Sequence, residues 1–442
     1  MIALVRIIRS RIFPFIVLVL VSVGFVSLHA TENAPISPFD EYVYLDYLAK
    51  VPTQGLVKPG EETGEFARNA ISCRGVLNFG EYGERCDVGT HQDDAKYPYG
   101  GRTGADIYTP LYFASTWVVA QPLTWLGVDL LDAGRLVGGL WLALGTSLTF
   151  TLLRLLRVNR PAALGLSLGM IATPVVFWAT TYLSTDAPTL AVAATIGCVT
   201  NLVATRRLHP VYFPIVAAVA VLFKVQNLAA VGVGAVALLT WTVVQFIKAR
   251  RESPARHSLA LMAKDGRAIT AVLALVAGLA AQVSWMVFRS LVTLPDVQDA
   301  GVDTVRLPLS LTGLVDEAFR FMKSIGATDM VPGAFGAFVA NVFMLMAIAA
   351  VIGILVDSKS RPAAHFSVAL AILVVTLTMG PALSLAVRFS VGYYFPLPAR
   401  YGLVLIPTFV AAIGLYLYRF DGVGKWVVLA VGSLGAAAAI VA

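Results

Sequence analysis

Residues 12–42 read IFPFIVLVLVSVGFVSLHATENAPISPFDEY. The run from Ile12 to Leu28 is apolar, and a bilayer core of about 30 Å needs about 20 such residues in a helix. After a short polar stretch, Asp40 and Glu41 place two carboxylates just outside the predicted membrane span. An apolar span followed by an acidic pair therefore indicates both a membrane fold and a candidate site.

The composition supports the same fold class. The 442 residues are 58% hydrophobic and 13% charged, with a mean hydropathy of +0.78. Soluble domains are nearer half apolar and a quarter charged, so the sequence predicts an all-α polytopic membrane protein of about 11 transmembrane helices. The predicted spans are 12–30, 133–156, 162–182, 187–205, 210–224, 226–247, 268–290, 333–356, 364–386, 400–419 and 424–442.

The amino-terminal segment has two interpretations. Arg6, Arg9 and Arg11 before an apolar run resemble a secretory signal peptide. The small-residue cleavage pattern after Leu28 is poor and the run is long enough to span, which favours a retained first helix.

The segment 108–128 is apolar enough to cross, but Pro110, Gln121 and Pro122 interrupt it. The positive-inside rule decides its placement. If 108–128 does not cross and the amino terminus is cytoplasmic, the basic clusters all fall inside, and a surface or re-entrant helix is expected. These clusters are Arg154/Arg157/Arg160, Arg206/Arg207, Lys248/Arg250/Arg251, Lys359/Arg361 and Arg419/Lys425.

The predicted organisation is a single membrane domain, residues 1–442, with 31–131 as an inserted outer loop and surface-helix region and 291–332 as a second outer loop. The net charge of +7 comes from clusters at the ends of the spans, so nucleic-acid binding is not expected. Cys198 lies in an apolar helix, whereas Cys73 and Cys86 share the outer loop and are a disulfide candidate in an oxidising compartment.

The charged residues without an orientation role all fall on the outer side. Asp40 at a membrane surface suits a general base, although Asp40 and Glu41 also suit the first turn of a helix as simple caps. Lys224 interrupts an apolar run, which marks a functional candidate or a lysine that snorkels to the interface. Arg388 and Arg400 flank an aromatic, proline-rich outer segment.

Aromatic and basic residues in the outer loop suit a sugar or phosphate, and they are also ordinary loop composition. They lie in Lys96–Arg102 and Tyr108–Tyr112. His91 with nearby acidic residues is a weak signal for a divalent cation, so a metal requirement stays open. The sequence contains no P-loop and no dinucleotide fingerprint, so an activated sugar would have to arrive by the membrane.

Taken together, these motifs resemble the GT-C superfamily of integral-membrane glycosyltransferases, which use polyprenyl-phosphate-linked sugars. The resemblance is spread over most of the chain. Its motifs are Phe39-Asp40-Glu41 in the first outer loop, Pro110-Leu111-Tyr112, Arg135-Leu136, Thr185 to Pro188, Lys224, and Arg400-Tyr401 before Pro407.

The resemblance implies roles for these positions. Asp40 would be the catalytic base, and Lys224 with Arg102 or Arg400 would hold the lipid phosphate. Glu41, Asp186, Tyr112 and Tyr401 would complete the substrate site. Two departures are visible: Tyr108-Thr109 replaces the usual His or Lys before the Pro-Leu-Tyr segment, and Val225-Gln226 follows the lysine.

The expected function is transfer of a sugar from a polyprenyl-phosphate donor to a glycan or glycolipid acceptor. The reaction would take place on the outer face of the inner membrane, among membrane lipids, by an inverting displacement. Two alternatives remain. A transporter or flippase of lipid-linked sugars would need the cations but not the base, and a non-catalytic subunit of an envelope-assembly complex would need neither.

Overall fold

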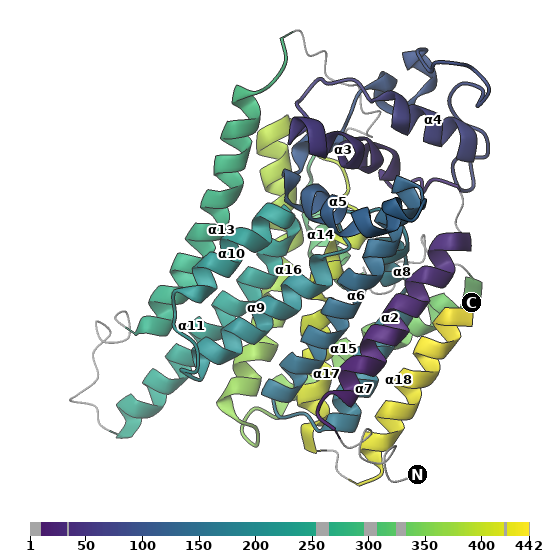
Figure 1. Cartoon of the computed structure of the whole chain (residues 1–442). Coiled ribbons are helices and arrows are strands. Elements are labelled where there is room, and N and C mark those ends of the chain that lie inside the picture. Colours follow the sequence, from purple (N-terminus) through teal and green to yellow (C-terminus); the bar gives the residue numbers. More distant parts are fainter. Residues whose placement is uncertain are drawn as a thin grey trace, which may run out of the picture.

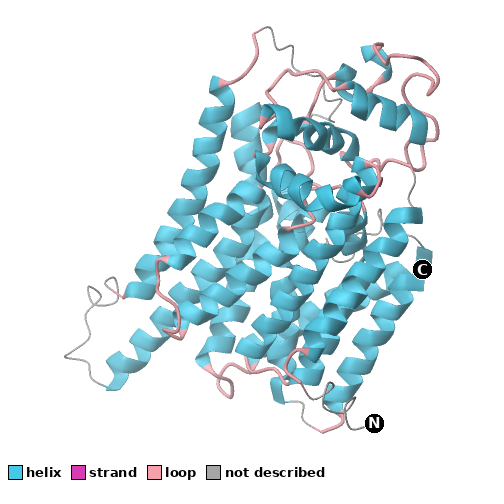
Figure 2. Cartoon of the chain, in the orientation of Figure 1, coloured by secondary structure: helices cyan, strands magenta, loops and turns pink. Residues whose placement is uncertain are grey.

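The computed structural model describes residues 10–32, 35–252, 265–295, 307–323, 333–419 and 422–441. These residues form helices joined by loops and short 3-10 turns (Figure 2), and within them only isolated β-bridges occur. Long helices run side by side as a bundle, and shorter helices lie crosswise over one end of it (Figure 1). We call the end covered by the crosswise helices the capped end.

Eight helical segments are long and apolar enough to cross a membrane, and a bent pair and two shorter apolar helices bring the number of apolar segments to eleven among the described residues. This confirms the predicted polytopic, all-α membrane fold. The long helices are α2 (Phe13–Glu32), α6 (Leu130–Leu155), α11 (Leu228–Glu252), α13 (Gly266–Leu291), α15 (Gly333–Val356), α16 (Ala363–Val391), α17 (Ile406–Tyr416) preceded by the 3-10 turn η9 (Ala399–Leu405), and α18 (Gly424–Val441).

The segment expected as a straight span at 162–182 is instead broken. Helix α7 (Arg160–Gly169) and the turn η4 (Met170–Ala172) meet α8 (Pro174–Thr181) at an angle of 71°. The break falls at Thr173, which has an extended backbone, because a following proline disfavours the helical conformation. Helix α8 then packs tightly on α6: a Cβ on Gly138 would lie 1.9 Å from the carbonyl oxygen of Thr180.

A second break lies at Lys224, between a short apolar helix and the long helix α11. Helix α9 (Thr189–Ala204) is followed by α10 (Tyr212–Phe223), which ends at Lys224. Lys224 is extended, with φ −165° and ψ 133°, and the turn η5 (Val225–Asn227) leads into α11. The lysine therefore lies in a gap between helices and not on a helix face.

The cap consists of α3 (Glu41–Gln54), α4 (Glu65–Arg74) and α5 (Pro110–Trp125) (Figure 1). Helix α5, which corresponds to the ambiguous segment 108–128, is not among the candidate spans and packs against α3 and α6. This placement agrees with the expectation from the charge pattern. Arg74 at the end of α4 pairs with Asp132 at 2.7 Å and fixes the cap to the start of α6.

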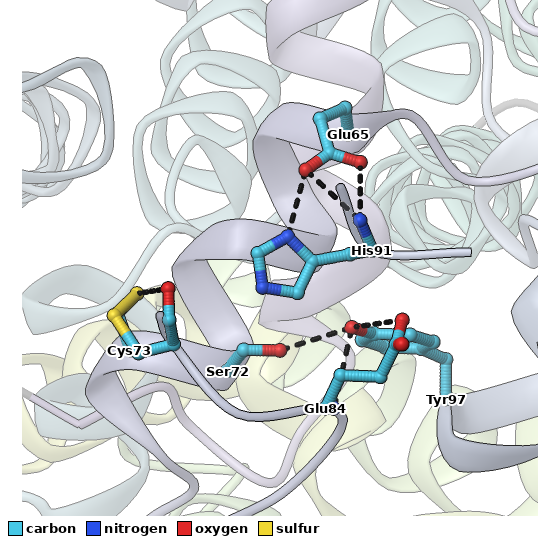
Figure 3. The surroundings of a disulfide bond; sticks show 7 residues. Glu65, Ser72, Cys73, Glu84, His91 and Tyr97 are labelled. Atoms are coloured by element: carbon cyan, nitrogen blue, oxygen red, sulfur yellow. Dashed lines mark hydrogen bonds and ion pairs between the residues drawn. A yellow bond between two sulfur atoms is a disulfide. The ribbon is translucent and has the colours of Figure 1, made fainter. Parts of the chain in front are cut away.

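A disulfide joins Cys73 at the end of α4 to Cys86 in the following loop. Figure 3 shows the polar contacts around it: the Glu65 carboxylate lies 2.7 Å from Nδ1 of His91, and the hydroxyls of Ser72 and Tyr97 are 3.0 Å apart. These contacts hold the long outer loop against α4.

The loops that carry the predicted basic clusters lie at the end of the bundle opposite the cap (Figure 1). Of the second outer loop, residues 291–332, the described parts are its first residues and the stretch 307–323. That stretch contains α14 (Leu311–Lys323), which packs against α16 and η9.

Candidate functional site

Asp40 lies at the capped end, directly before α3. Its backbone is left-handed, with φ 63°, and its side chain makes no capping bond to the helix. This observation removes the simple capping explanation for Asp40. The carboxylate instead accepts hydrogen bonds from the Tyr99 hydroxyl at 3.1 Å and from Nη2 of Arg400 at 2.8 Å, and its side chain stays 30% exposed. Asp40 is therefore fixed in position yet reachable by a ligand.

Lys224 and Asp186 form a second ion pair beside the first. Nζ of Lys224 lies 2.6 Å from Oδ1 of Asp186, and both side chains are buried. Nε of Arg400 lies 3.8 Å from the other oxygen of Asp186. The four charges thus alternate in the order Asp40, Arg400, Asp186, Lys224, and the cluster carries no net charge.

Aromatic rings surround the two cations. Nζ of Lys224 lies 5.6 Å from the ring centre of Tyr108 and 5.5 Å from that of Tyr401. The Arg400 guanidinium lies 5.4 Å from the ring of Phe39. Aromatic faces attract cations, and a pair of fixed cations suits an anionic ligand.

The segment before Arg400 is anchored from α14. Glu317 is fully buried, and its Oε1 accepts hydrogen bonds from the Tyr394 hydroxyl at 2.7 Å and from the backbone N–H of Leu397 at 3.2 Å. Arg320 forms an ion pair with the same oxygen at 2.8 Å. Because Leu397 precedes Arg400 by less than one helical turn, this anchor sets where the guanidinium lies.

The structure gives Glu41 a different place from the one expected. Its carboxylate is fully buried and pairs twice with Arg135, at 2.8 Å for each oxygen. Two backbone N–H groups, of Ser37 and Leu183, also donate to it at 2.7 and 2.8 Å. Its lone pairs are occupied, so Glu41 holds α3, α6 and the segment after α8 together. The expected role of Glu41 in binding substrate is therefore corrected to a structural role.

The other predicted residues lie in three different places. Tyr401 and Asp186 lie in the charged cluster. Tyr112 is buried on α5, and its hydroxyl accepts from the Ser184 N–H at 3.2 Å, so it supports the turn that carries Asp186. Arg102 lies apart, because its guanidinium donates to the Gly60 carbonyl at 3.0 Å and the cation beside Asp40 is Arg400.

Tyr99 and Tyr108 were foreseen only as part of aromatic loop segments. Burial, and next the negative charge of Asp40, raise the pKa of the Tyr99 hydroxyl well above its ordinary value. Burial likewise raises the pKa of Tyr108, whose hydroxyl lies 3.1 Å from that of Tyr44. Both phenols therefore stay protonated, and Tyr99 remains a donor to Asp40.

The described residues contain no group of three or more His, Cys, Asp or Glu side chains placed to hold a metal ion. His91, the histidine considered for such a role, is bound to Glu65 and belongs to the packing of the outer loop.

No protein-family model matches the chain, and no curated protein does. Among solved structures, the chain is similar to the crystal structure of ArnT from Cupriavidus metallidurans bound to undecaprenyl phosphate. The identity is 16% and the TM-score is 0.45, over 93% of this chain and 61% of that one. The chain thus spans about three fifths of that protein's length. The function proposed next rests on the chain's own residues.

Proposed function

We propose that the protein is a GT-C type membrane glycosyltransferase that moves a sugar from a polyprenyl-phosphate donor to a hydroxyl of a glycan or glycolipid acceptor. One observation carries the proposal: the partly exposed carboxylate of Asp40 lies beside Arg400, which together with the buried Lys224 and Asp186 forms a neutral cluster. A base adjoining two fixed cations is what displacement of a phosphate by a hydroxyl requires.

The reaction is a single displacement at the anomeric carbon. The acceptor oxygen forms the new bond to this carbon as the bond to the phosphate oxygen breaks, and the polyprenyl phosphate leaves with the electron pair. Asp40 accepts the proton of the acceptor hydroxyl, a contribution of about 10²–10⁴-fold in rate. Lys224 and Arg400 compensate the charge that grows on the departing phosphate, and one displacement inverts the configuration.

The charge order of the cluster supports a coupling between donor binding and the base. Without substrate, the two cations are matched by Asp40 and Asp186. A lipid phosphate competes for Arg400 and Lys224 and draws Arg400 from Asp40. Asp40 is then free to accept a proton only when a donor is present.

The chain's own residues are assigned to every step of this mechanism. The need for a divalent cation stays open, as it did from the sequence, and turnover before and after chelation tests it. We place the site on the outer face of an inner membrane, as the positive-inside rule favours.

One observation favours a transporter of lipid-linked sugars as a second candidate. Broken helices whose ends meet near a binding site are typical of transporters. Among the described residues one span is broken, at Thr173, and the extended Lys224 separates α10 from α11 beside the charged cluster. The two functions differ in the need for a base. Purified protein that releases polyprenyl phosphate from a polyprenyl-phosphate sugar in the presence of an acceptor is an enzyme; loss of turnover in Asp40→Asn with donor binding intact assigns the base.

A further inference from the structure

A narrow pocket adjoins the charged cluster on the side of the broken helix. Asp186 and Arg400 line one wall, and Trp178 and Tyr182, at the end of α8, line another. Phe39, the neighbour of Asp40 in the chain, also lines it. The pocket therefore touches Arg400, one of the two cations assigned to the phosphate, and Phe39, the residue next to the base.

The aromatic wall is rigid. The rings of Trp178 and Tyr182 are nearly parallel, with centres 5.1 Å apart and 12° between their planes. The rings of Phe39 and Trp178 are nearly perpendicular with centres 4.9 Å apart, and the Arg135 guanidinium lies 5.1 Å from the ring centre of Tyr182. Since Arg135 is itself fixed by Glu41, these rings are held in place before any ligand binds.

The hydroxyl of Tyr182 has no hydrogen-bond partner, although this residue is only 2% exposed. Buried hydroxyls are usually bonded. Several described residues are exceptions, and among those that line this pocket the exception is Tyr182. A pocket with aromatic walls, a carboxylate and an unsatisfied hydroxyl fits a sugar ring, whose C–H face stacks on aromatic rings and whose hydroxyls bind polar groups.

We propose that this pocket receives the sugar ring of the lipid-linked donor, stacked on Trp178, with one sugar hydroxyl bonded to Tyr182. This assignment rests on the proposed function. The free space in the pocket is about 10 Å³, enough for one water molecule and too small for a sugar ring. The sugar therefore enters as Arg400, which lines the pocket, turns from Asp40 to the donor phosphate. One movement then seats the ring and frees the base.

Tyr182→Phe provides the sharp test, because it removes only a hydroxyl that has no partner in the folded chain. Binding of two probes to the purified full chain is compared: a polyprenyl phosphate that carries a sugar, and the same polyprenyl phosphate without one. We expect Tyr182→Phe to weaken binding of the sugar-bearing probe about fivefold, the usual effect of one hydrogen bond. Binding of the bare probe and the melting temperature should not change.

Tyr47→Phe is the matched control. Its hydroxyl is also buried, but Tyr47 stacks on Phe113 and does not line the pocket, so neither probe should be affected. Trp178→Ala should weaken the sugar-bearing probe more than Tyr182→Phe does.

Equal binding of the sugar-bearing probe by wild type and Tyr182→Phe, with wild-type transfer intact, overturns the pocket assignment and leaves the proposed function standing. A rise in the KM for acceptor alone also overturns it, because the pocket then holds the acceptor. A wild-type protein that binds neither lipid overturns the proposed function itself, and the pocket assignment with it.

Discussion

Nη2 of Arg400 lies 2.8 Å from Oδ2 of Asp40, although 360 positions separate the two residues in the chain. This pair joins the start of the cap to the helical segment before α17, so the bundle must be assembled before the site exists. It also compensates the charge of the carboxylate to which we assign the role of base. Donor binding therefore has to rearrange this pair before transfer begins.

The orientation of the chain is tested by labelling. A single cysteine at Asp93, which is exposed in the outer loop, should react with an impermeant thiol reagent added to intact cells. One at Arg251, at the end of α11, should not. Replacing the buried native Cys198 by alanine removes background labelling from its free thiol. Labelling of the cysteine at position 251 from outside would contradict the predicted orientation. A further position expected outside from the sequence, Ala300, lies beyond the described residues.

The disulfide predicts the number of free thiols. The chain has three cysteines, and with Cys73 and Cys86 joined, unreduced and unfolded protein should show one reactive thiol, that of Cys198. Closing this short loop contributes about 2–4 kcal/mol to the free energy of unfolding. Cys73→Ser with Cys86→Ser should lower the melting temperature but leave donor binding intact, because the disulfide is not part of the charged cluster. Three reactive thiols in unreduced protein would contradict the pairing.

Lys224 should hold the donor phosphate. Lys224→Ala removes the cation and leaves Asp186 buried without its partner, so both donor affinity and stability should fall, the latter by about 3–5 kcal/mol. Lys224→Arg keeps the charge and should retain part of the turnover.

Lys224→Ala combined with Asp186→Ala separates the two effects. The double variant removes the unpaired carboxylate and should recover stability without recovering donor binding. Recovery of turnover in the double variant would mean that Lys224 serves only to neutralise Asp186.

The spans could be predicted because about 20 apolar residues are needed wherever a helix crosses the bilayer. The place of α5 followed from the prolines at 110 and 122 together with the basic clusters, which left one orientation. The break at Thr173 could not be predicted in the same way, since membrane helices tolerate proline when neighbours satisfy the freed backbone. The structure shows the break directly, because Thr173 is extended and α8 begins at the proline with a 71° change of direction.

The site was foreseen in part. Asp40, Lys224 and Arg400 came from motif order, and the structure brings Arg400 against Asp40 and beside the ion pair of Lys224. The sequence did not decide the separate positions of Asp40 and Glu41. Asp40 is fixed by a partner 360 positions away and Glu41 by a partner 94 positions away. Trp178 and Tyr182 gave no signal, since aromatic residues near the end of an apolar segment are typical of an interfacial belt.

Tyr394→Phe tests whether α14 positions Arg400. The variant removes the hydrogen bond from Tyr394 to the buried Glu317, and such a bond to a charged group contributes about 1.5–3 kcal/mol. The segment before Arg400 should loosen, so the KM for donor should rise more than kcat falls. Tyr212→Phe, an exposed position on α10, is the control and should change neither. An unchanged KM in Tyr394→Phe, with a lower melting temperature, would limit Glu317 to a structural role.

Asp40→Asn and Glu41→Gln should fail in different ways, although the residues are adjacent. Asn keeps the size of Asp40 but accepts no proton at neutral pH, so transfer should fall about 10²–10⁴-fold. The partly exposed pair with Arg400 contributes only about 0–1 kcal/mol, so Asp40→Asn should stay folded and bind donor. Glu41→Gln breaks a fully buried pair with Arg135 and should cost about 3–5 kcal/mol of stability.

Transfer from a synthetic polyprenyl-phosphate sugar, donor affinity and melting temperature, measured on the same purified variants, separate these outcomes. The expected pattern is an inactive, stable Asp40→Asn that binds donor, and a Glu41→Gln whose melting temperature drops while its folded fraction at low temperature still turns over. A stable but inactive Glu41→Gln beside an active Asp40→Asn would move the base to Glu41. Normal transfer by Asp40→Asn, with Glu41→Gln merely unstable, would remove the acidic pair from the mechanism, because neither carboxylate would then be needed to accept the proton of the acceptor.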